Sequence, residues 1–425
     1  MRPRLLVVFF ALAALIAAGG LGIVRATNVA AATSTLAVSG NQLVDNGQTV
    51  ILRGVNRSGS EYACHQGWGF FDGRTDDAAV AAIASWGSNA VRVPLNEDCW
   101  LGINGVAAAY SGANYRAAIA GFVTSLRAHG LYVILSNQVA GPGTDLSTTI
   151  LPMPDADHAP TFWSSVAATF KTDKGVIFDL YNEPHDVSWN CWANGCYVTS
   201  GYNVVHPYQA AGMTSLTAAI RGAGATNVIL IAGIDWSYTI DNWLAMRPPN
   251  DGQLMAGIHN YGGTPNTPAA WDTAYAPTAL QVPVTIGEMG FDGYIETLMP
   301  WADAHGIGYL AWTWDTWGPP QALITDYDGT PSAYGLGFKS YLASHLVGSG
   351  RPGVNQSTSN PPTSRAANQS TPSPSPAPRI VAQPAATTSA AKDSAPASAP
   401  VPSILLASQA LQLLMRWLLG HVAWS

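Results

Sequence analysis

The stretch VIFDLYNEP, residues 176–184, is a nearly continuous apolar run that ends in Asn-Glu-Pro. Apolar side chains at almost every position are typical of a strand that is buried on both faces of a parallel sheet. Glu183 then stands where this strand meets a loop. Enzymes hold acid–base and nucleophilic carboxylates at such places, because a packed scaffold positions them more firmly than a solvated helix face does. The stretch therefore predicts a buried parallel strand that ends in a functional carboxylate.

Glu288 repeats this arrangement at the end of the shorter apolar run VTIG, residues 284–287. Two strand-end glutamates this far apart in the chain meet only if the fold gathers the ends of its strands. A barrel of parallel strands does so at its carboxyl-terminal rim. For either glutamate alone, a helix cap or an ion pair with a nearby arginine is an equally good interpretation. The two together favour a pair of catalytic carboxylates.

Short β-prone segments alternate with alanine-rich, helix-like segments along the chain. The expected strands are residues 51–56, 90–94, 132–135, 176–182, 228–233, 254–259, 284–288 and 308–314. The expected helices include residues 76–86, 115–129, 160–171, 207–221, 293–305 and 332–346. This alternation predicts an α/β fold, a (β/α)8 TIM barrel. An open doubly wound sheet is the alternative, but no glycine-rich phosphate loop follows the first strand.

Both ends of the chain differ in composition from this central part. Ahead of the barrel, residues 36–50 predict a β-hairpin around Asp45-Asn46-Gly47. In residues 1–32, Arg2 and Arg4 precede an apolar run and small-residue sites, which is typical of a secretory signal peptide; an uncleaved membrane anchor is the competing interpretation. We therefore expect a secreted protein, with weak membrane or cell-surface association through its ends as a further interpretation.

The remaining boundaries follow from composition. We expect the catalytic domain to span residues 33–347. Residues 348–402 are rich in Pro, Ser, Thr and Ala and predict a disordered linker. Residues 403–425 predict a short apolar, amphipathic helical tail; the alternative is the remnant of a lost binding module.

The charge balance limits the partners. The 425 residues carry a net charge of -7 at pH 7, and 11% of them are charged. Nucleic acids need a basic surface, which this balance does not supply. An uncharged substrate fits better, and the 15 Trp and 16 Tyr residues suit flat sugar rings, although Trp more often fills a core. We expect a monomer that binds a polysaccharide and no nucleic acid.

The four cysteines are interpreted as two disulfides, which an exported protein can form. Cys191 and Cys196 close a tight loop after the strand that carries Glu183. Cys64 and Cys99 follow two strands that we expect to be adjacent, so they form the second pair. Metal binding is the weaker alternative because the chain has no CxxC or HExxH spacing. We expect neither a metal site nor a cofactor.

Five elements near expected strand ends carry a resemblance to a known family. They are Arg92 in VRVP on the second strand, Asn182-Glu183-Pro184 on the fourth, His259-Asn260-Tyr261 on the sixth, Glu288 on the seventh and Trp312 on the eighth. Together they resemble glycoside hydrolase family 5, the large cellulase-containing family. Asn-Glu-Pro alone is a weak match, but its order and spacing with the other four elements make the set specific. The resemblance covers roughly residues 33–346.

The resemblance implies a role for each of these residues. Glu183 would be the acid/base and Glu288 the nucleophile of a retaining glycosidase. The other residues would act on the substrate or the nucleophile: Asn182 as a donor to the sugar 2-hydroxyl, Arg92, His259 and Tyr261 as the groups that hold and tune Glu288, and Trp312 as the platform under the sugar ring, with Trp314 as its competitor. Each also has a structural interpretation, such as a buried histidine or a barrel-lining salt bridge.

Gln138 departs from the family pattern. Members usually carry a histidine shortly after the third strand, whereas here the strand runs into Ser-Asn-Gln. An amide donates and accepts hydrogen bonds but carries no charge, which puts the contacts to the sugar, and hence rate and preference, in question. Four more acids on expected rim loops are interpreted as solvated or subsite residues: Glu61, Glu97, Asp98 and Asp315.

Two functions of different class follow from the sequence. The first is a secreted, retaining β-glycosidase that hydrolyses internal β-1,4 linkages, with cellulose or soluble β-glucan as the expected substrate and mannan or another β-glycan as a variant. The second is a catalytically weakened polysaccharide-binding protein on the same fold.

Removal of residues 348–425 is predicted to leave the melting temperature and the activity on soluble substrate nearly unchanged. The reason is that this composition cannot contribute to a hydrophobic core. Thermal denaturation and activity of the full chain and of a chain that ends at residue 347 test the prediction. A loss of many degrees would show that the tail packs on the barrel.

Overall fold

The computed structural model describes residues 33–263, 265–290 and 292–345. All of them belong to the first of two units, Met1–Val354 and Asn355–Ser425. The expected signal peptide (1–32), linker (348–402) and apolar tail (403–425) lie outside the described residues. The description below therefore concerns the expected catalytic domain.

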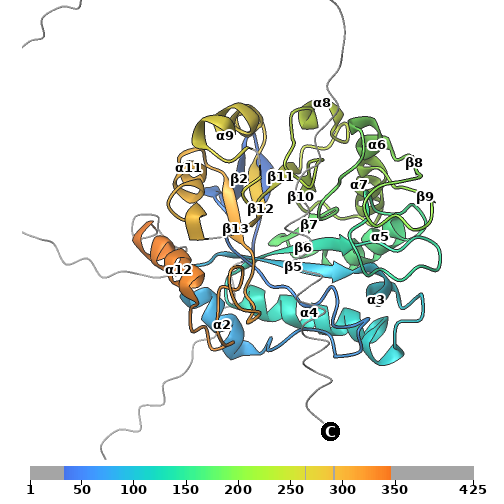
Figure 1. Ribbon diagram of the computed structural model, residues 1–425, viewed down its shortest axis with the longest axis horizontal. Helices are drawn as coiled ribbons and strands as arrows, with labels where there is room; N and C mark the ends of the chain where they lie inside the picture. Colours follow the sequence, from blue (N-terminus) through green and yellow to red (C-terminus); the bar gives the residue numbers. More distant parts are fainter. Residues whose placement is uncertain (1–32, 264, 291, 346–425) are drawn as a thin grey trace, which may run out of the picture. The chain divides into compact units, whose positions relative to one another are not determined.

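Within the described residues, eight parallel strands close into a barrel (Figure 1). In chain order they are β4 (Arg53–Asn56), β5 (Ala90–Asn96), β6 (Tyr132–Val139), β7 (Val176–Asp179), β10 (Ile229–Ala232), β11 (Leu254–Asn260), β12 (Val284–Met289) and β13 (Gly308–Ala311). Each pairs with its neighbours in this order, and β13 returns to β4. The predicted TIM barrel is confirmed, and every expected strand segment overlaps one of its strands.

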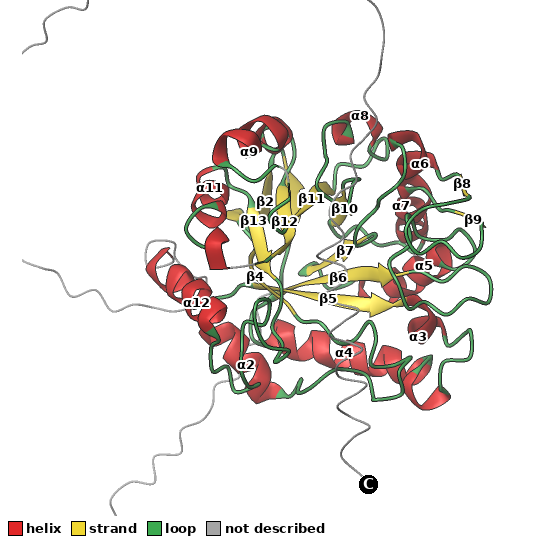
Figure 2. Ribbon diagram, in the orientation of Figure 1, coloured by secondary structure: helices red, strands yellow, loops and turns green. Residues whose placement is uncertain are grey.

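Helices surround the strands as an outer layer (Figure 2). They are α2 (Asp77–Ser85), α3 (Glu97–Leu101), α4 (Ala113–Ala128), α5 (Ala159–Phe170), α6 (Trp189–Asn194), α7 (Met213–Gly222), α8 (Trp243–Met246), α9 (Pro268–Ala274), α10 (Ala276–Ala279), α11 (Leu298–Ala304) and α12 (Ala333–His345). Local sequence sets their starts. For example, the Asp76 side chain accepts from the backbone N–H of Ala79 and caps α2.

Two helices begin later than expected. The segment 207–221 was expected to be helical throughout, but β9 (Tyr208–Gln209) pairs with β8 (Tyr197–Val198) before α7 begins. Likewise α11 begins only at Leu298, after the short turn Asp292–Tyr294. In both places an alanine- or apolar-rich composition continues across a turn, so composition alone overestimates the helix.

A small antiparallel sheet precedes the barrel. The expected hairpin is present as β2 (Gln42–Asp45) and β3 (Gln48–Val50), joined at Asn46 and Gly47, whose φ angles of 50° and 78° suit a two-residue turn. A third strand, β1 (Ala37–Ser39), was not expected. Leu36 and Leu43 pack with the barrel-interior side chains Leu52, Ile134, Ile177, Leu230, Met255 and Leu310. The sheet thus closes the amino end of the barrel and leaves the carboxyl end for the site.

Both predicted disulfides are present. Cys64, in the loop that follows β4, is linked to Cys99 in α3, directly after β5; the two strands pair as expected, and the two Cα atoms lie 6.2 Å apart. Cys191 in α6 is linked to Cys196, just after the end of that helix, in the connection that follows β7. Each crosslink therefore constrains a loop at the carboxyl end of the barrel.

Glu97 and Asp98 are fully buried, not solvated as expected. They begin α3 directly after β5. Glu97 Oε1 accepts from the backbone N–H of Gly141 at 2.9 Å, and Asp98 Oδ2 accepts from that of Ser147 at 2.8 Å. These bonds tie the end of β5 to the loop after β6. Two further acids that were expected to be exposed or to face subsites, Glu61 and Asp315, are buried as well.

Asp155, also fully buried, brings a second carboxyl group to Glu97. Atoms of Glu97, Asp155 and His158 lie within 4.8 Å of one another. Burial, strengthened by the charge of Asp155, raises the pKa of Glu97 well above its usual range, and burial raises the pKa of Asp155. Since two buried like charges repel strongly, the stable arrangement is a pair that shares a proton.

This pair predicts a loss of stability at alkaline pH. The folded state keeps a proton that the unfolded chain has already released, so the free energy of unfolding falls as the pH rises through the raised pKa. Glu97→Gln, which is neutral at every pH, should flatten this decline over the pH range above the usual pKa of a glutamate. Chemical denaturation across that range measures the slope. The exposed Glu296, changed to Gln, is the matched control, and equal slopes in all three proteins would refute the shared proton.

Candidate active site

Arg92 lies fully buried on β5 at the carboxyl end of the barrel. A guanidinium has five N–H donors, and the structure gives this one five acceptors. Nε donates to Asp179 Oδ2 (2.8 Å), Nη1 to Glu288 Oε1 (2.6 Å) and Asn56 Oδ1 (3.1 Å), and Nη2 to Asn182 Oδ1 (2.7 Å) and Ser136 Oγ (2.8 Å). The acceptors come from or directly follow β4, β6, β7 and β12, so one side chain links the ends of five strands.

Glu288 receives a hydrogen bond on each carboxylate oxygen. Arg92 donates to Oε1, and the Tyr261 hydroxyl donates to Oε2 at 2.5 Å. The carboxylate is almost completely buried. Bonds from a cation and a phenol stabilise the ionised form of a carboxyl group, so Glu288 is arranged to act as an anion.

Glu183 follows β7 and is the more accessible of the two glutamates, with a side chain 14% exposed. Burial raises its pKa to about 7, against the opposing effect of the Arg92 charge. Its Oε1 lies 2.8 Å from Nδ1 of His259. Burial lowers the pKa of His259 to about 4, so this imidazole is neutral near pH 7. Glu183 is therefore arranged to carry a proton near neutrality.

His259 lies between the two glutamates, a different position from the one expected. It was expected to hold Glu288 together with Arg92 and Tyr261, but its Nδ1 is 2.8 Å from Glu183 and 3.7 Å from Glu288. Gly287 makes room for the ring, because a Cβ there would lie 3.0 Å from His259 Nε2. The imidazole thus bonds to the proposed acid/base and only approaches the proposed nucleophile.

The two carboxyl groups are close together. One ligand atom each of Glu183, His259 and Glu288 lies within 4.8 Å of the others. Two glutamates at this distance, one stabilised as an anion and the other favouring its proton, form the type of pair that carries out acid–base and nucleophilic chemistry on one bond.

Comparison with known proteins agrees with this geometry. Residues 43–318 match the profile of the family described as Cellulase (glycosyl hydrolase family 5). The chain belongs to this family. The resemblance noted in the sequence is thereby confirmed.

Relatives of this chain carry the names of two kinds of enzyme, mannanases and endoglucanases. Two mannan endo-1,4-beta-mannosidases, from Cellvibrio japonicus and Streptomyces lividans, are 24% and 25% identical to this chain over 65% and 67% of its length. Endoglucanase C of Evansella cellulosilytica is 27% identical over 52% of the chain. The chain spans 58%, 67% and 25% of the lengths of these three proteins.

Solved structures share the fold. A beta-glucanase from Saccharophagus degradans in complex with cellotetraose is 20% identical, with a TM-score of 0.58, and covers 73% of this chain and 94% of its own. The catalytic domain of a mannanase from Streptomyces sp. SirexAA-E is 23% identical, with a TM-score of 0.51, and covers 71% and 88%. At these identities the likeness establishes the fold alone. Among the described residues, no helix has the length and apolarity needed to cross a bilayer.

The two candidate platforms of this family 5 chain lie in different surroundings. Trp312 follows β13, is 5% exposed, and its ring lies 6.3 Å from that of Trp317. Trp314 is fully buried and packs edge-on against Trp86 at 4.6 Å. The expectation that Trp314 could serve as the sugar platform is therefore wrong, because its ring is part of the core.

Asn182 and Gln138 both lie at strand ends. Because Asn182 Oδ1 accepts from Arg92, its Nδ2 group is the part left to donate to a ligand. Gln138 lies where the pairing of β5 with β6 is irregular, between Leu95 and Asn96 on the partner strand. Its Oε1 atom is buried and has no hydrogen-bond partner among the described residues.

Several residues of the site were missed in the sequence. Asn56, Ser136 and Asp179 are polar residues inside otherwise apolar strands, and this contrast was the signal that could have found them. The turn Asp235-Trp236-Ser237 was also missed, and its three φ angles of 54°, 60° and 64° gave no sequence signal.

This turn braces the site. The Trp236 N–H donates to the Pro184 carbonyl at 3.0 Å, and the Ser237 hydroxyl to the Asn182 carbonyl at 3.0 Å. Non-glycine residues in this region cost about 1–3 kcal/mol each, and such strain persists where surrounding contacts impose it. The half-buried Trp236 ring stacks on His185, with centroids 3.7 Å apart.

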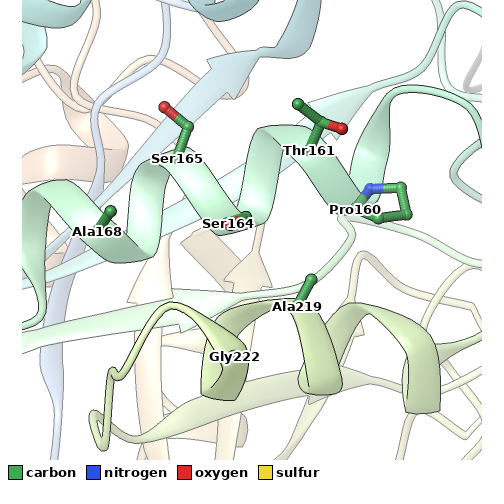
Figure 3. Close-up of a pocket in the computed structure, with 7 residues that line it drawn as sticks. All are labelled: Pro160, Thr161, Ser164, Ser165, Ala168, Ala219 and Gly222. Carbon is green, nitrogen blue, oxygen red and sulfur yellow. The ribbon is translucent and has the colours of Figure 1, made fainter.

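A groove of about 560 Å³ lies elsewhere, between α5 and α7 (Figure 3). Its lining consists of small or uncharged residues: Pro160, Thr161, Ser164, Ser165, Ala168, Ala219 and Gly222. None of these side chains titrates near neutral pH. The groove belongs to the helical layer and contributes nothing to the glutamate pair, so we assign it no role.

Replacement of Gln138 is predicted to act mainly on kcat, because a group beside the reacting sugar affects the transition state more than ground-state binding. Gln138→Ala should lose activity through an unfilled hydrogen-bond position. Gln138→His should keep or raise activity and change the pH profile, since an imidazole titrates near neutrality. Steady-state kinetics across pH test this. If all three proteins have one kcat and one profile, Gln138 lies outside the site.

Proposed function

We propose that this family 5 protein is a secreted, retaining endo-β-1,4-glycosidase with Glu183 as acid/base and Glu288 as nucleophile. The observation that carries the proposal is the approach of the two carboxyl groups within 4.8 Å. Retaining enzymes keep them about 5–5.5 Å apart so that one attacks carbon directly, whereas inverting enzymes leave roughly 6.5–9.5 Å for a water molecule.

Each step uses a property of the site. Glu183, with a pKa near 7, donates its proton to the leaving glycosidic oxygen while a Glu288 oxygen attacks the anomeric carbon. The C–O bond to the leaving sugar breaks, and a glycosyl ester of Glu288 forms. Glu183, now ionised, takes a proton from water, whose oxygen displaces Glu288 from the same carbon. Two inversions retain the configuration.

Neighbouring groups support the two stages. Arg92 and Tyr261 stabilise Glu288 whenever it is an anion, before attack and as it leaves. His259, neutral near pH 7, bonds to Glu183 without adding a positive charge that would remove its proton. We assign Asn182 Nδ2 to the sugar 2-hydroxyl and Trp312 to the face of the ring at the cleavage site.

The backbone sugar is proposed to be glucose, in cellulose or a soluble β-glucan, as in the endoglucanases among the relatives. Mannan is the second candidate because two of the relatives are mannan endo-1,4-beta-mannosidases. These two backbones differ in the orientation of the 2-hydroxyl, the group assigned to Asn182. A weakened polysaccharide-binding protein is the remaining alternative, and the unusual Gln138 is its motivation.

A panel of polysaccharides separates these possibilities. The purified protein is incubated with carboxymethyl cellulose, mixed-linkage β-glucan and mannan, and reducing ends are measured. Glu288→Gln, which keeps the shape of the side chain without its charge, is the control. Release of reducing ends by the wild type alone supports hydrolysis, and the preferred polymer gives the substrate. Binding without release in both proteins would support the binding function instead.

Loss of either glutamate is predicted to lower hydrolysis by about 10²-fold or more, since general acid catalysis alone contributes typically 10²–10⁴-fold. An aryl glycoside whose leaving group needs no proton should partly rescue Glu183→Ala but not Glu288→Ala. The fall of wild-type activity above about pH 7, caused by ionisation of Glu183, should vanish in Glu183→Ala. Equal losses of activity on the aryl glycoside would overturn the two roles.

A further inference from the structure

We propose that Asp179 is a positioning residue that shares the charge of Arg92 with Glu288 and so sets how strongly the nucleophile is held as an anion. The inference rests on the proposed role of Glu288. It assigns a function to a buried residue that bonds to Arg92.

The geometry places one cation against two carboxylates. Asp179 is the last residue of β7, 1% exposed, and its Oδ2 accepts from Arg92 Nε at 2.8 Å. Glu288 accepts from Nη1 of the same guanidinium at 2.6 Å. The two carboxylates thus bind different nitrogens of one guanidinium and share its positive charge.

The other three acceptors of Arg92 are neutral. Asn56, Ser136 and Asn182 fix the position of the guanidinium without offsetting its charge. Asp179 alone adds a negative charge that competes with Glu288. Arg92, Asp179 and Glu288 are all buried, so this competition is strong, because charges interact more strongly at low dielectric.

Ionisation of Asp179 depends on Arg92 in return. Burial raises the pKa of Asp179, and the guanidinium opposes that rise. His259, the further titratable group that acts on Asp179, is neutral near pH 7 because burial lowers its pKa to about 4. The balance therefore lies among Asp179, Arg92 and Glu288.

The consequence for catalysis has a definite sign. Without the Asp179 charge, the whole Arg92 charge acts on Glu288, so its anion is held more tightly. A carboxylate held more tightly is a weaker nucleophile. The first step should slow, and the acid limb of the kcat/KM profile, which reports ionisation of the nucleophile in the free enzyme, should move to lower pH.

The test begins with three substitutions in the full chain. Asp179→Asn should lower kcat/KM by about tenfold and move the acid limb down by about one pH unit, which corresponds to one decade in the equilibrium. Ser136→Ala removes a neutral acceptor of Arg92 and should lower activity with the limb in place. Asp179→Glu keeps the charge and should restore the limb even if the longer side chain reduces kcat.

Asp303→Asn is the matched control. Asp303 forms the same type of pair with Arg53 at 2.8 Å, where β4 begins, at the opposite end of the barrel. This substitution should leave both limbs of the profile unchanged. The Arg53–Asp303 pair is only partly buried, and its loss controls for the removal of an arginine–aspartate pair away from the site.

A further variant moves the negative charge from position 179 to position 136. Ser136 lies in register with Asp179 and accepts from the same guanidinium. Ser136→Asp in the Asp179→Asn background should return the acid limb toward its original position. If Asp179→Asn does not fold, Ser136→Asp in the wild-type background still tests the idea, because a second anion should move the limb to higher pH.

The outcomes distinguish the two levels of the argument. An inactive wild-type protein would defeat the proposed function. If the wild type is active, two results would overturn the role of Asp179 while leaving that function intact. One is the same acid limb of the kcat/KM profile in Asp179→Asn and Ser136→Ala; the other is a shift of that limb to lower pH in Ser136→Asp.

Discussion

The carboxyl end of this barrel depends on the burial of one charge. A guanidinium removed from water is tolerated only when its donors are satisfied and its charge is balanced. Arg92 meets both conditions through acceptors at the ends of several strands. Each strand must therefore keep its register for the bonds to form. The position of Glu288, the proposed nucleophile, is thus a consequence of barrel closure, because this residue lies in β12 itself.

The same charge gives two glutamates opposite tendencies. Glu288 accepts a hydrogen bond from Arg92 directly. Glu183 interacts with the Arg92 charge only through space, and the effect of burial exceeds that interaction and raises the pKa of Glu183 to about 7. His259 preserves this difference. A charged imidazole beside Glu183 would favour loss of its proton, but burial keeps the ring neutral near pH 7. The buried Arg92 and the neutral His259 are thus sufficient to give the two glutamates different tendencies to ionise.

The sequence predicted the elements whose apolar residues follow a regular pattern. It did not predict contacts that depend on an irregular strand pairing or on residues far apart in the chain. The strands, both disulfides and the two strand-end glutamates follow from apolar runs and spacing. The partner of His259 does not, because the pairing of β11 with β12 shifts between Ile258 and His259, and a one-residue shift moves a side chain to the other face. Trp314 was misjudged for a similar reason, since its burial depends on contact with Trp86, far away in the chain.

Membership of family 5 and choice of substrate depend on different parts of the molecule. The charge network uses strand ends, which barrel closure fixes, so it can be the same for glucan and mannan. In the proposed function Asn182 can only donate to the sugar 2-hydroxyl, because Arg92 occupies its oxygen. The 2-hydroxyl lies at different places in glucan and mannan, so we expect the choice between them to depend on which of the two places this donor reaches. Gln138 is a second polar group near the strand ends, and its buried Oε1 lacks a partner among the described residues.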